Sequence, residues 1–352
     1  MGGAEVFTRE VSKRWVQNGH EVTLFTSEFP GCKREEVLDG VHIIRRGGKY
    51  SVYKNAKKYY KEFFSKENFD IVIDEVNTRP FLTPKFVNKG ERIIALIHQL
   101  AREYWFYETP FPVNYVGYYF LENRWLKNYR NQLTVTVSES TRKDLQDLGF
   151  KHVSVVGEGL NFKPLDEVSK KMASPTVVYA GRLKKAKRPD HAVRAFKIVH
   201  SRFPKAELWV IGDGSFKSDL QRMASEGVMF KGHMNNDERR NSIKRSWVLV
   251  NPSVREGFGL NIVEANALGV PCVAYNVGGL RDAVVDGQTG FLVEAGNTEA
   301  LAGQIIRILE DEDLRLTLSQ NALSHSKAFS WDSVANEFMR VAKTVIGDRL
   351  KS

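Results

Sequence analysis

The sequence contains little cysteine and no long apolar run. Only Cys32 and Cys272 occur among 352 residues, and neither belongs to a CxxC motif or a Cys/His cluster. This pattern excludes a disulfide framework and a zinc site, and it fits a reducing compartment. No segment reaches the roughly 18 apolar residues that a membrane-spanning helix needs, and the start MGGAEVFTRE lacks the apolar core of a signal peptide. We therefore expect a cytoplasmic protein.

The chain carries an excess of positive charge. Its 52 lysine and arginine residues stand against 42 aspartate and glutamate residues, which gives a net charge of +10. Such a surface favours partners that carry phosphate, namely nucleic acid, anionic lipid or nucleotide sugars. The two halves of the chain share the excess about evenly. Because a nucleic-acid-binding protein needs a concentrated basic face, we expect no nucleic-acid partner.

Strand and helix patterns alternate through the second half. From Pro175 onward, short apolar runs such as TVVYAG, AELWVIG and VPCVAYN are separated by amphipathic stretches such as DHAVRAFKIVHSRF. This alternation predicts β-α-β units and a parallel sheet with helices on both faces. Residues 166–332 are therefore expected to form one doubly wound domain.

The first half follows the same rhythm less regularly. It contains a predicted helix over 5–18 and predicted strands at HEVTLFT, GVHIIRR, DIVIDE, RIIALIH and TVTVS. A GGAE loop that opens a helix normally follows a strand, so either this first strand is absent or the sheet is built without it. We expect residues 1–165 to form the N-terminal domain, joined by a returning C-terminal helix over 333–352. The fold class is then α/β, with two facing Rossmann-like domains and ligands in the cleft between them.

The segment REGFGLNIVEANALGVPCVAYNVGG places two carboxylates around a Gly-Phe-Gly turn. Glu256 and Glu264 are eight positions apart, and Gly257 and Gly259 let backbone amides approach a ligand because they have no Cβ. A helix that starts near Gly259 directs its free N–H groups toward a bound diphosphate. The rise from there to Glu264 is about 7.5 Å, comparable to the distance from a donor's phosphates to its ribose. The alternative is a capping role for Glu256 and a solvated Glu264.

A basic cluster follows the strand that ends at Gly181. The sequence there is GRLKKAKRPD. Cations at the carboxyl end of a parallel strand face the ligand-binding crevice, where they can neutralise a departing diphosphate. We select Arg182 and Lys187 for this role, and the alternative for each lysine of the cluster is a solvated surface position.

Together these segments resemble glycosyltransferase family 4. The likeness covers nearly the whole chain and rests on GGAE, GRLKKAK, GDG at 212–214 and EGFGLNIVE, with ALGVPCVAYNVGG and VVDGQTGFLV. It implies the GT-B fold, with residues 1–165 as the acceptor-side domain and residues 166–332 as the nucleotide-sugar-binding domain. It also implies retaining transfer of a hexose from a UDP- or GDP-linked sugar. It also implies no metal and no other cofactor, and no Asp-x-Asp pair is placed like a metal-binding motif in the sequence.

The resemblance further implies roles for individual residues. Glu256 would contact the donor sugar and Glu264 its ribose, while Arg182 and Lys187 would contact the diphosphate. His98, at the end of the apolar strand RIIALIH, would bind the donor sugar near the reacting centre. The remaining donor-binding positions are Gly2, Gly3, Gly181, Gly212, Gly232, His233, Met234, Gly257, Phe258, Gly259 and Leu260.

The acceptor is expected to be a hydroxyl of a glycan, a lipid or another molecule. The aromatic segment 104–129 could stack on sugar rings, lie at a lipid interface, or form a helical lid over the first sheet. The basic stretch 49–64 predicts either an amphipathic helix on anionic lipid, at the inner face of the membrane, or a solvated helix. A nucleotide-sugar epimerase of the same fold and a catalytically degenerate sugar-nucleotide-binding protein remain alternatives. Base, sugar, acceptor and oligomeric state stay unassigned.

Overall fold

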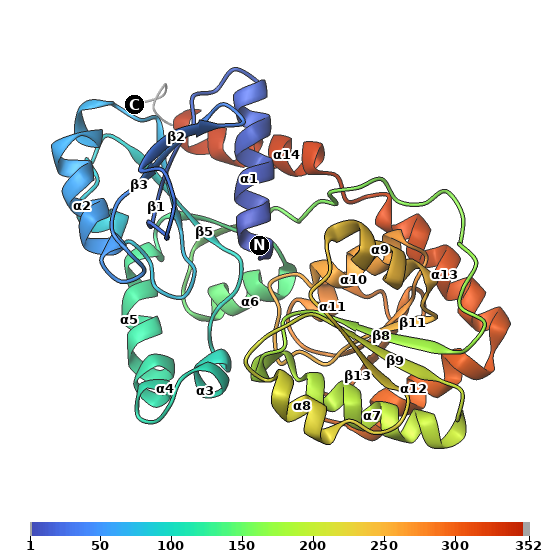
Figure 1. Ribbon diagram of the computed structural model, residues 1–352. Coiled ribbons are helices and arrows are strands. Elements are labelled where there is room, and N and C mark those ends of the chain that lie inside the picture. Colours follow the sequence, from blue (N-terminus) through green and yellow to red (C-terminus); the bar gives the residue numbers. More distant parts are fainter. Residues whose placement is uncertain (1, 348–352) are drawn as a thin grey trace. The chain divides into compact units, whose positions relative to one another are not determined.

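The computed structural model describes residues 2–347 (Figure 1). The chain divides into two compact units. Unit 1 comprises Met1–Arg102, Tyr115–Gly159 and Ser330–Ser352, and unit 2 comprises Glu103–Asn114 and Leu160–Phe329.

The observed division of the chain differs in two places from the expected single boundary between residues 165 and 166. The chain passes into unit 2 at Leu160, because the polar stretch that follows is held by this unit: the Leu165 N–H donates to the Ala267 carbonyl at 2.9 Å. The segment Glu103–Asn114 also groups with unit 2, although it lies within the first half of the sequence. No local sequence pattern predicted that this segment groups with unit 2.

The strands of unit 1 form a three-stranded and a four-stranded sheet. In the first, β3 lies between a parallel β1 and an antiparallel β2; in the second, β4, β5, β6 and β7 run parallel in that order. The bounds are β1 (Thr23–Thr26), β2 (Glu35–Leu38), β3 (Val41–Arg45), β4 (Ile71–Glu75), β5 (Arg92–Ile97), β6 (Leu133–Thr136) and β7 (His152–Val155).

Each sheet of unit 1 has two edge strands, β1 and β2 in the first sheet and β4 and β7 in the second. Among the strands that the structure describes, β1 pairs only with β3, and β4 pairs only with β5. A doubly wound sheet grows outward on both sides of a central first strand. No such central strand lies between β1 and β4 in the described chain, so the sheet is built as two parts.

The helices of unit 1 include two that pack side by side, α1 (Gly3–Gln17) and α14 (Trp331–Gly347) (Figure 1). Trp15 joins them, because its ring lies 5.1 Å from that of Phe338 and its indole N–H donates to the Ala335 carbonyl at 3.0 Å. The other helices are α2 (Val52–Glu62), α5 (Glu122–Leu126) and α6 (Glu139–Asp147), and α4 (Val113–Val116) lies where the chain returns from unit 2.

Unit 2 contains one six-stranded sheet in which every strand runs parallel to its neighbours. The order β10-β9-β8-β11-β12-β13 changes direction between β8 and β11. Ligands of such sheets bind outside the carboxyl ends of the strands at this point. The bounds are β8 (Thr176–Ala180), β9 (Glu207–Ile211), β10 (Val228–Gly232), β11 (Val248–Asn251), β12 (Cys272–Tyr275) and β13 (Gly290–Val293).

Helices cover both faces of this sheet (Figure 1). On one face α7 packs against α8 and α12, and on the other α10 packs against α9 and α13. Both units therefore have the Rossmann-like α/β architecture predicted from the sequence. The bounds are α3 (Tyr104–Glu108), α7 (Pro189–Arg202), α8 (Lys217–Met223), α9 (Asn236–Arg245), α10 (Leu260–Ala267), α11 (Leu280–Ala283), α12 (Thr298–Glu310) and α13 (Glu312–Ser326).

Candidate functional site

The centre of the candidate site in unit 2 is an ion pair between Lys187 and Glu256. Lys187 ends a short 3-10 turn after β8, and Glu256 lies in the loop between β11 and α10. The Lys187 Nζ atom lies 2.5 Å from Glu256 Oε2, and the Ser253 hydroxyl donates to Glu256 Oε1 at 2.8 Å. Only 14% and 18% of the two charged side chains are exposed. The structure thus brings together two residues that the sequence analysis selected separately.

Tyr104 lies next to this ion pair. The Lys187 Nζ atom is 5.7 Å from the centroid of the Tyr104 ring, whose hydroxyl donates to the Arg255 carbonyl at 3.1 Å. Burial alone would lower the pKa of Lys187, but Glu256 and Tyr104 outweigh burial and raise this pKa above its ordinary value. Burial also raises the pKa of Tyr104. At neutral pH the pair is therefore an ammonium and a carboxylate beside a neutral phenol.

Arg182 adds a second cation at the carboxyl end of β8. Its backbone carbonyl accepts a hydrogen bond from the Tyr179 hydroxyl at 3.2 Å. Its side chain is exposed and makes no hydrogen bond or ion pair within the part of the chain that the structure describes. The guanidinium is therefore available to bind an anion.

The loop Gly257–Gly259 leads into α10, which begins at Leu260. Gly259 has a left-handed backbone with φ of 80°, a conformation that glycine adopts at little cost. Phe258 is buried, and its ring lies 5.7 Å from that of Phe329. The first turn of α10 has N–H groups without partners inside the helix, and such groups bind anions.

Glu264 pairs with an arginine that the sequence analysis did not select. The Arg239 Nη1 atom of α9 lies 2.8 Å from Glu264 Oε2. The pair holds the carboxylate in place, and an ionised carboxylate keeps further acceptor capacity for a hydroxyl. Nothing in NDERRNSIKR distinguishes Arg239 from the adjacent Arg240, so the local sequence gave no signal for this partner.

The ends of β8, β9 and β10 bring three predicted glycines close together. The Gly212 N–H donates to the Gly232 carbonyl at 2.8 Å. A Cβ at Gly212, where φ is 136°, would lie 2.0 Å from the Gly181 carbonyl oxygen, so this approach requires a residue without a side chain. His233 and Met234 follow directly after Gly232, with the His233 side chain exposed.

In unit 1, His98 follows the last residue of β5 and lies between two carboxylates. Its Nε2 atom is 3.5 Å from Glu75 Oε1, and its Nδ1 atom is 3.9 Å from Glu158 Oε1. Burial alone would lower the pKa of His98, but Glu158 and Glu75 outweigh burial and raise it to about 9. His98 is therefore an imidazolium at neutral pH, and neither ring nitrogen has a hydrogen-bond partner among the described residues.

The sequence analysis missed both of these carboxylates. Glu75 ends the strand DIVIDE, so its place at the carboxyl end of a strand was an available signal; Glu158 lies in the polar stretch GEGLNF, where no pattern marks it. Gly2 precedes α1 as its N-cap, and Gly3 is the first residue of this helix. A Cβ at Gly3 would lie 3.9 Å from both Glu158 carboxylate oxygens, which places the start of α1 near the His98 cluster.

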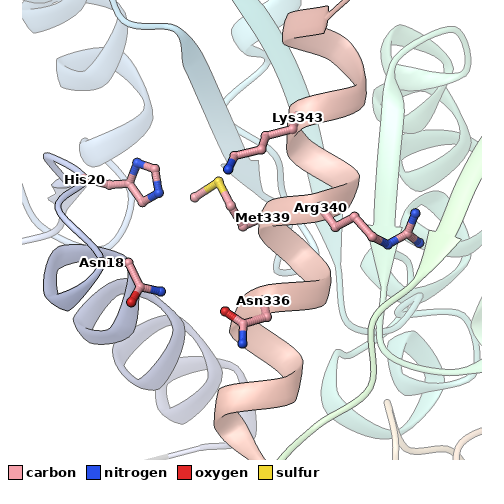
Figure 2. A pocket seen from close by; sticks show the side chains of 6 residues that line it. All are labelled: Asn18, His20, Asn336, Met339, Arg340 and Lys343. Atoms are coloured by element: carbon pink, nitrogen blue, oxygen red, sulfur yellow. The ribbon is translucent and has the colours of Figure 1, made fainter.

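A hollow of about 420 Å³ in unit 1 lies apart from these residues, between the end of α1 and α14. Figure 2 shows Lys343 and Met339 directed toward His20 across this hollow. Arg340, which also lines it, pairs with Glu337 at 2.6 Å. No residue selected from the sequence lines the hollow, so we do not include it in the candidate site.

Comparison with known proteins assigns a family description to each half of the chain. Residues 163–325 match the family model described as "Glycosyl transferases group 1", and residues 1–163 match the model described as "Glycosyltransferase Family 4". The boundary between the two matches falls close to the end of unit 1's second range at Gly159.

Individual relatives match part or all of the chain. The D-inositol 3-phosphate glycosyltransferase of Acidothermus cellulolyticus is 33% identical over 187 residues, which cover 49% of this chain and 42% of that protein. The N-acetyl-alpha-D-glucosaminyl L-malate synthase of Bacillus anthracis is 25% identical over 374 residues, which cover 99% of this chain and 95% of that protein. The match therefore spans less than half of the first relative and nearly all of the second.

Solved structures share the fold over the whole chain. The sucrose-phosphate synthase of Thermosynechococcus elongatus has a TM-score of 0.82 at 20% identity, covering 99% of this chain and 94% of its own. The Anabaena protein HepE, solved in complex with UDP and glucose, has a TM-score of 0.73 at 16% identity, covering 97% and 96%. These likenesses establish the GT-B fold.

Proposed function

Because this chain belongs to glycosyltransferase family 4, we propose that it transfers a hexose from a nucleotide diphosphate sugar to an acceptor hydroxyl, with retention of configuration. The observation that carries this proposal is the largely buried Lys187–Glu256 ion pair, with the unpaired Arg182 guanidinium after the end of β8. These groups lie at the carboxyl ends of β8 and β11, where parallel α/β sheets bind their ligands.

The site supports a separate task for each group. Glu256 accepts hydroxyls of the donor sugar, and Glu264, held by Arg239, accepts those of the ribose. The diphosphate lies on the first turn of α10, between the loop Gly257–Gly259 and the side chains of Arg182 and Lys187. The base lies against backbone of Gly232, His233 and Met234. In unit 1, the His98 imidazolium donates to a hydroxyl of the donor sugar.

Arg182 and Lys187 assist the cleavage of the bond between the sugar and the diphosphate. As the bond between the anomeric carbon and the diphosphate oxygen breaks, negative charge accumulates on the leaving group, and Arg182 and Lys187 stabilise this charge more strongly than that of the intact donor. The acceptor oxygen attacks the same face, and its proton passes to an oxygen of the departing diphosphate. The enzyme then contributes orientation and charge stabilisation. On this route no metal ion is needed, so activity should persist in excess EDTA.

The names of similar proteins suggest which donor and which class of acceptor to test first. HepE was solved with UDP and glucose, so we take a UDP-linked hexose as the first donor to test and a GDP-linked one as the second. The names of three similar proteins contain inositol 3-phosphate, L-malate and sucrose-phosphate. Each is a small hydroxylated molecule with an anionic group, which makes such a molecule the acceptor we propose.

A donor panel tests the proposal. We expect one of the UDP-, GDP- and ADP-sugars to bind and to be hydrolysed slowly, and both Glu256→Ala and Glu264→Ala to lose this binding by roughly tenfold or more. Arg222→Gln is the matched control, because this exposed residue of α8 forms an ion pair with Asp219 of the same helix and is not among the proposed donor contacts. Binding without transfer to any acceptor would point to a sugar-nucleotide-binding protein, and conversion of the donor's sugar without an acceptor would point to an epimerase.

Contact with an anionic membrane from the cytoplasmic side is a separate proposal. No helix in the described residues is long and apolar enough to cross a membrane. Aromatic side chains at Tyr119 and Phe120 are 55% and 67% exposed, and exposed aromatic groups favour a lipid interface. We expect the protein to co-sediment with anionic liposomes at low salt, and failure to do so would rule out this contact.

A further inference from the structure

Two carboxylates, Glu75 and Glu158, flank His98 in unit 1, and the proposed contacts with the donor use neither of them. Glu75 ends β4, His98 follows β5, and Glu158 follows β7. These positions are the carboxyl ends of strands of one parallel sheet, where ligands of such sheets bind. His98 and Glu158 are 9% and 6% exposed, whereas 27% of the Glu75 side chain is exposed. The His98 cluster, which consists of these three residues, is therefore enclosed but reachable from solvent beside Glu75.

Neighbouring side chains fix the orientation of Glu75 and of the His98 ring. The Thr8 hydroxyl of α1 donates to Glu75 Oε2 at 2.6 Å, which leaves Oε1 as the oxygen that faces His98 Nε2 at 3.5 Å. Phe7 packs against His98, with ring centroids 5.0 Å apart and ring planes at 84°. Phe7 is itself fully buried, and its ring lies 5.8 Å from that of Trp331. The cluster is therefore held by the packed core that joins α1 to α14.

The start of α1 stabilises the charge of Glu158. Gly3 lies so close that a Cβ there would be 3.9 Å from both oxygens of this carboxylate. Gly3 is the first residue of a helix of 15 residues, and the first N–H groups of a helix carry partial positive charge that favours a nearby carboxylate. Glu158 Oε2 nonetheless has no hydrogen-bond partner among the described residues. A buried acceptor without a partner favours a ligand that brings it a donor.

The ring nitrogens of His98 are open to a ligand in the same way. Their distances to Glu158 and Glu75, 3.9 and 3.5 Å, are long for a hydrogen bond, and neither nitrogen has a hydrogen-bond partner in the described part of the chain. Burial lowers the pKa of His98, but the two carboxylates outweigh burial and raise it to about 9. An imidazolium with two N–H donors thus lies beside an unpartnered carboxylate oxygen. A hydroxyl suits both groups, because it can accept from the first and donate to the second.

Negative charge exceeds positive charge in this cluster. One imidazolium lies between two carboxylates, each within 3.9 Å of a ring nitrogen. A ligand carboxylate placed here would add a third negative charge to a largely buried site, where like charges repel more strongly than in water. A hydroxyl adds no charge. The cluster therefore favours a neutral hydroxyl over a carboxylate.

We propose that Glu75 and Glu158 hold the His98 ring as a hydrogen-bond donor, and that the cluster selects a neutral sugar, bound through a hydroxyl, against a sugar acid. This inference rests on the proposed function, in which His98 meets the donor sugar, and deepens it by naming the class of donor. Glu75 acts only through His98 and is a positioning residue, whereas Glu158 also accepts a hydrogen bond from the sugar hydroxyl at Oε2. The donor is then a nucleotide-linked neutral hexose and not a hexuronate.

The first test follows the protonation of His98 by NMR in the full chain, without substrate. Isotope-labelled histidine gives separate ring signals, and the signal lost in His98→Gln is that of His98. We expect its titration midpoint to fall by about one pH unit or more in Glu75→Gln and in Glu158→Gln, because each change removes a charge that offsets the effect of burial. Glu62→Gln is the matched control, because this exposed residue of α2 pairs with Lys58 at 3.8 Å and lies outside the cluster.

The second test compares UDP-glucose with UDP-glucuronate as donors, or GDP-mannose with GDP-mannuronate if the donor panel selects GDP. Each protein is measured at a pH below its own His98 midpoint, so that the ring is protonated in all of them. We expect the wild type and Glu62→Gln to show a kcat/KM roughly tenfold or more higher for the neutral sugar. This ratio should fall in Glu75→Gln and Glu158→Gln, because the cluster then has one negative charge fewer.

Two results would overturn the inference. One is an unchanged His98 midpoint in both glutamine variants, and the other is equal use of the neutral and the acidic donor by the wild type. If no donor is used at all, the proposed function fails, whereas the NMR midpoints still show whether Glu75 and Glu158 hold the proton on His98. The same NMR signal, followed during titration with free glucose and with free glucuronate, reports the choice of sugar without turnover. The two proposals therefore fail separately.

Discussion

In this site one ion pair, that of Lys187 and Glu256, contributes both to the stability of the fold and to the proposed catalysis. Breaking a largely buried pair leaves an uncompensated charge, which costs about 3–5 kcal/mol. A loss of activity in a Lys187 variant would therefore mix unfolding with chemistry. The Arg182 side chain has no hydrogen-bond or ion-pair partner among the described residues, so its removal leaves no orphaned charge. It is the better residue with which to test the proposed stabilisation of the leaving group.

We expect Arg182→Gln to lower kcat for donor turnover by roughly 10²–10³-fold, the loss typical of removing one group that stabilises transition-state charge. KM for the donor should change less, because the interaction strengthens as the phosphate departs. Steady-state kinetics with a thermal melt on the same preparation provide the measurement. Lys184→Gln is the control, since the Lys184 side chain is 41% exposed and pairs with Glu108 at 3.2 Å. An unchanged kcat in Arg182→Gln would remove this residue from the mechanism.

At the scale of secondary-structure elements, the split sheet of unit 1 has a measurable consequence. The strands β1 and β4 each have one hydrogen-bonded neighbour, whereas β6 lies between β5 and β7. Amide groups on an unpaired strand edge have no carbonyl partner within the sheet. Local opening then requires fewer broken hydrogen bonds, and exchange with solvent is faster.

We expect peptides that cover β1 and β4 to exchange amide hydrogen at least tenfold faster than a peptide that covers β6. Exchange followed by mass spectrometry on the native protein gives the rates, and β11, which is paired on both sides in unit 2, serves as the internal reference. Equal protection of β1, β4 and β6 would mean that these edges are paired in solution, for instance with a second chain.

Elements of unit 2 could be predicted closely because each carries its own pattern. The runs that form β8, β9, β11 and β12 are short, apolar and closed by glycine, proline or asparagine, and the donor glycines stand at their ends. In unit 1, β2 has the sequence EEVL with no clear alternation, so pairing with β3 rather than its own composition makes it a strand. Local patterns also carry no information on why the strands of unit 1 form two separate sheets.

Contacts between residues far apart in the chain likewise could not be predicted from the sequence. The sequence analysis left the aromatic segment 104–129 open between sugar stacking, a lipid interface and a helical lid. It predicted no partner for the preceding Glu103, which pairs with Arg255 at a separation of 152 residues. Trp105 is buried and Tyr104 lies over Lys187. Glu158, which follows β7, lies 3.9 Å from His98, which follows β5. Such contacts depend on where the elements pack, which no spacing along the chain encodes.

At the scale of the whole molecule, the two units contain buried cationic groups with opposite pKa shifts. In unit 1 the pKa of His98 is raised from 6.5 to about 9, where Glu158 and Glu75 outweigh burial. In unit 2, burial and then the charge of Arg315 lower the pKa of Lys171 from 10.5 to about 7. The Lys171 ammonium donates to the carbonyls of Lys244 and Gly269 at 3.1 and 2.8 Å. The signs of these shifts determine how each unit responds to pH.

Between pH 6.5 and 9, folded unit 1 binds more protons at His98 than the unfolded chain does. The stabilisation from His98 is therefore fully present below pH 6.5 and is lost as pH rises through 9. Between pH 7 and 10.5, the unfolded chain binds more protons at Lys171 than folded unit 2 does, so this group makes unit 2 more stable as pH rises. From pH 7 to 9 the contributions of the two groups change in opposite directions.

We expect raising the pH from 7 to 9 to lower the urea midpoint of unit 1 and to raise that of unit 2. Pulsed hydrogen exchange along a urea titration reads both midpoints in one sample, from peptides that cover β5 and β11. His98→Gln should flatten the pH response of unit 1 alone, and Lys171→Met should flatten that of unit 2 alone. If the midpoints of both units moved in the same direction in the wild type, and neither variant changed them, the two groups would not control the pH response. Opposite movement would mean that pH changes the relative stability of the unit carrying His98 and the unit carrying the Lys187–Glu256 pair.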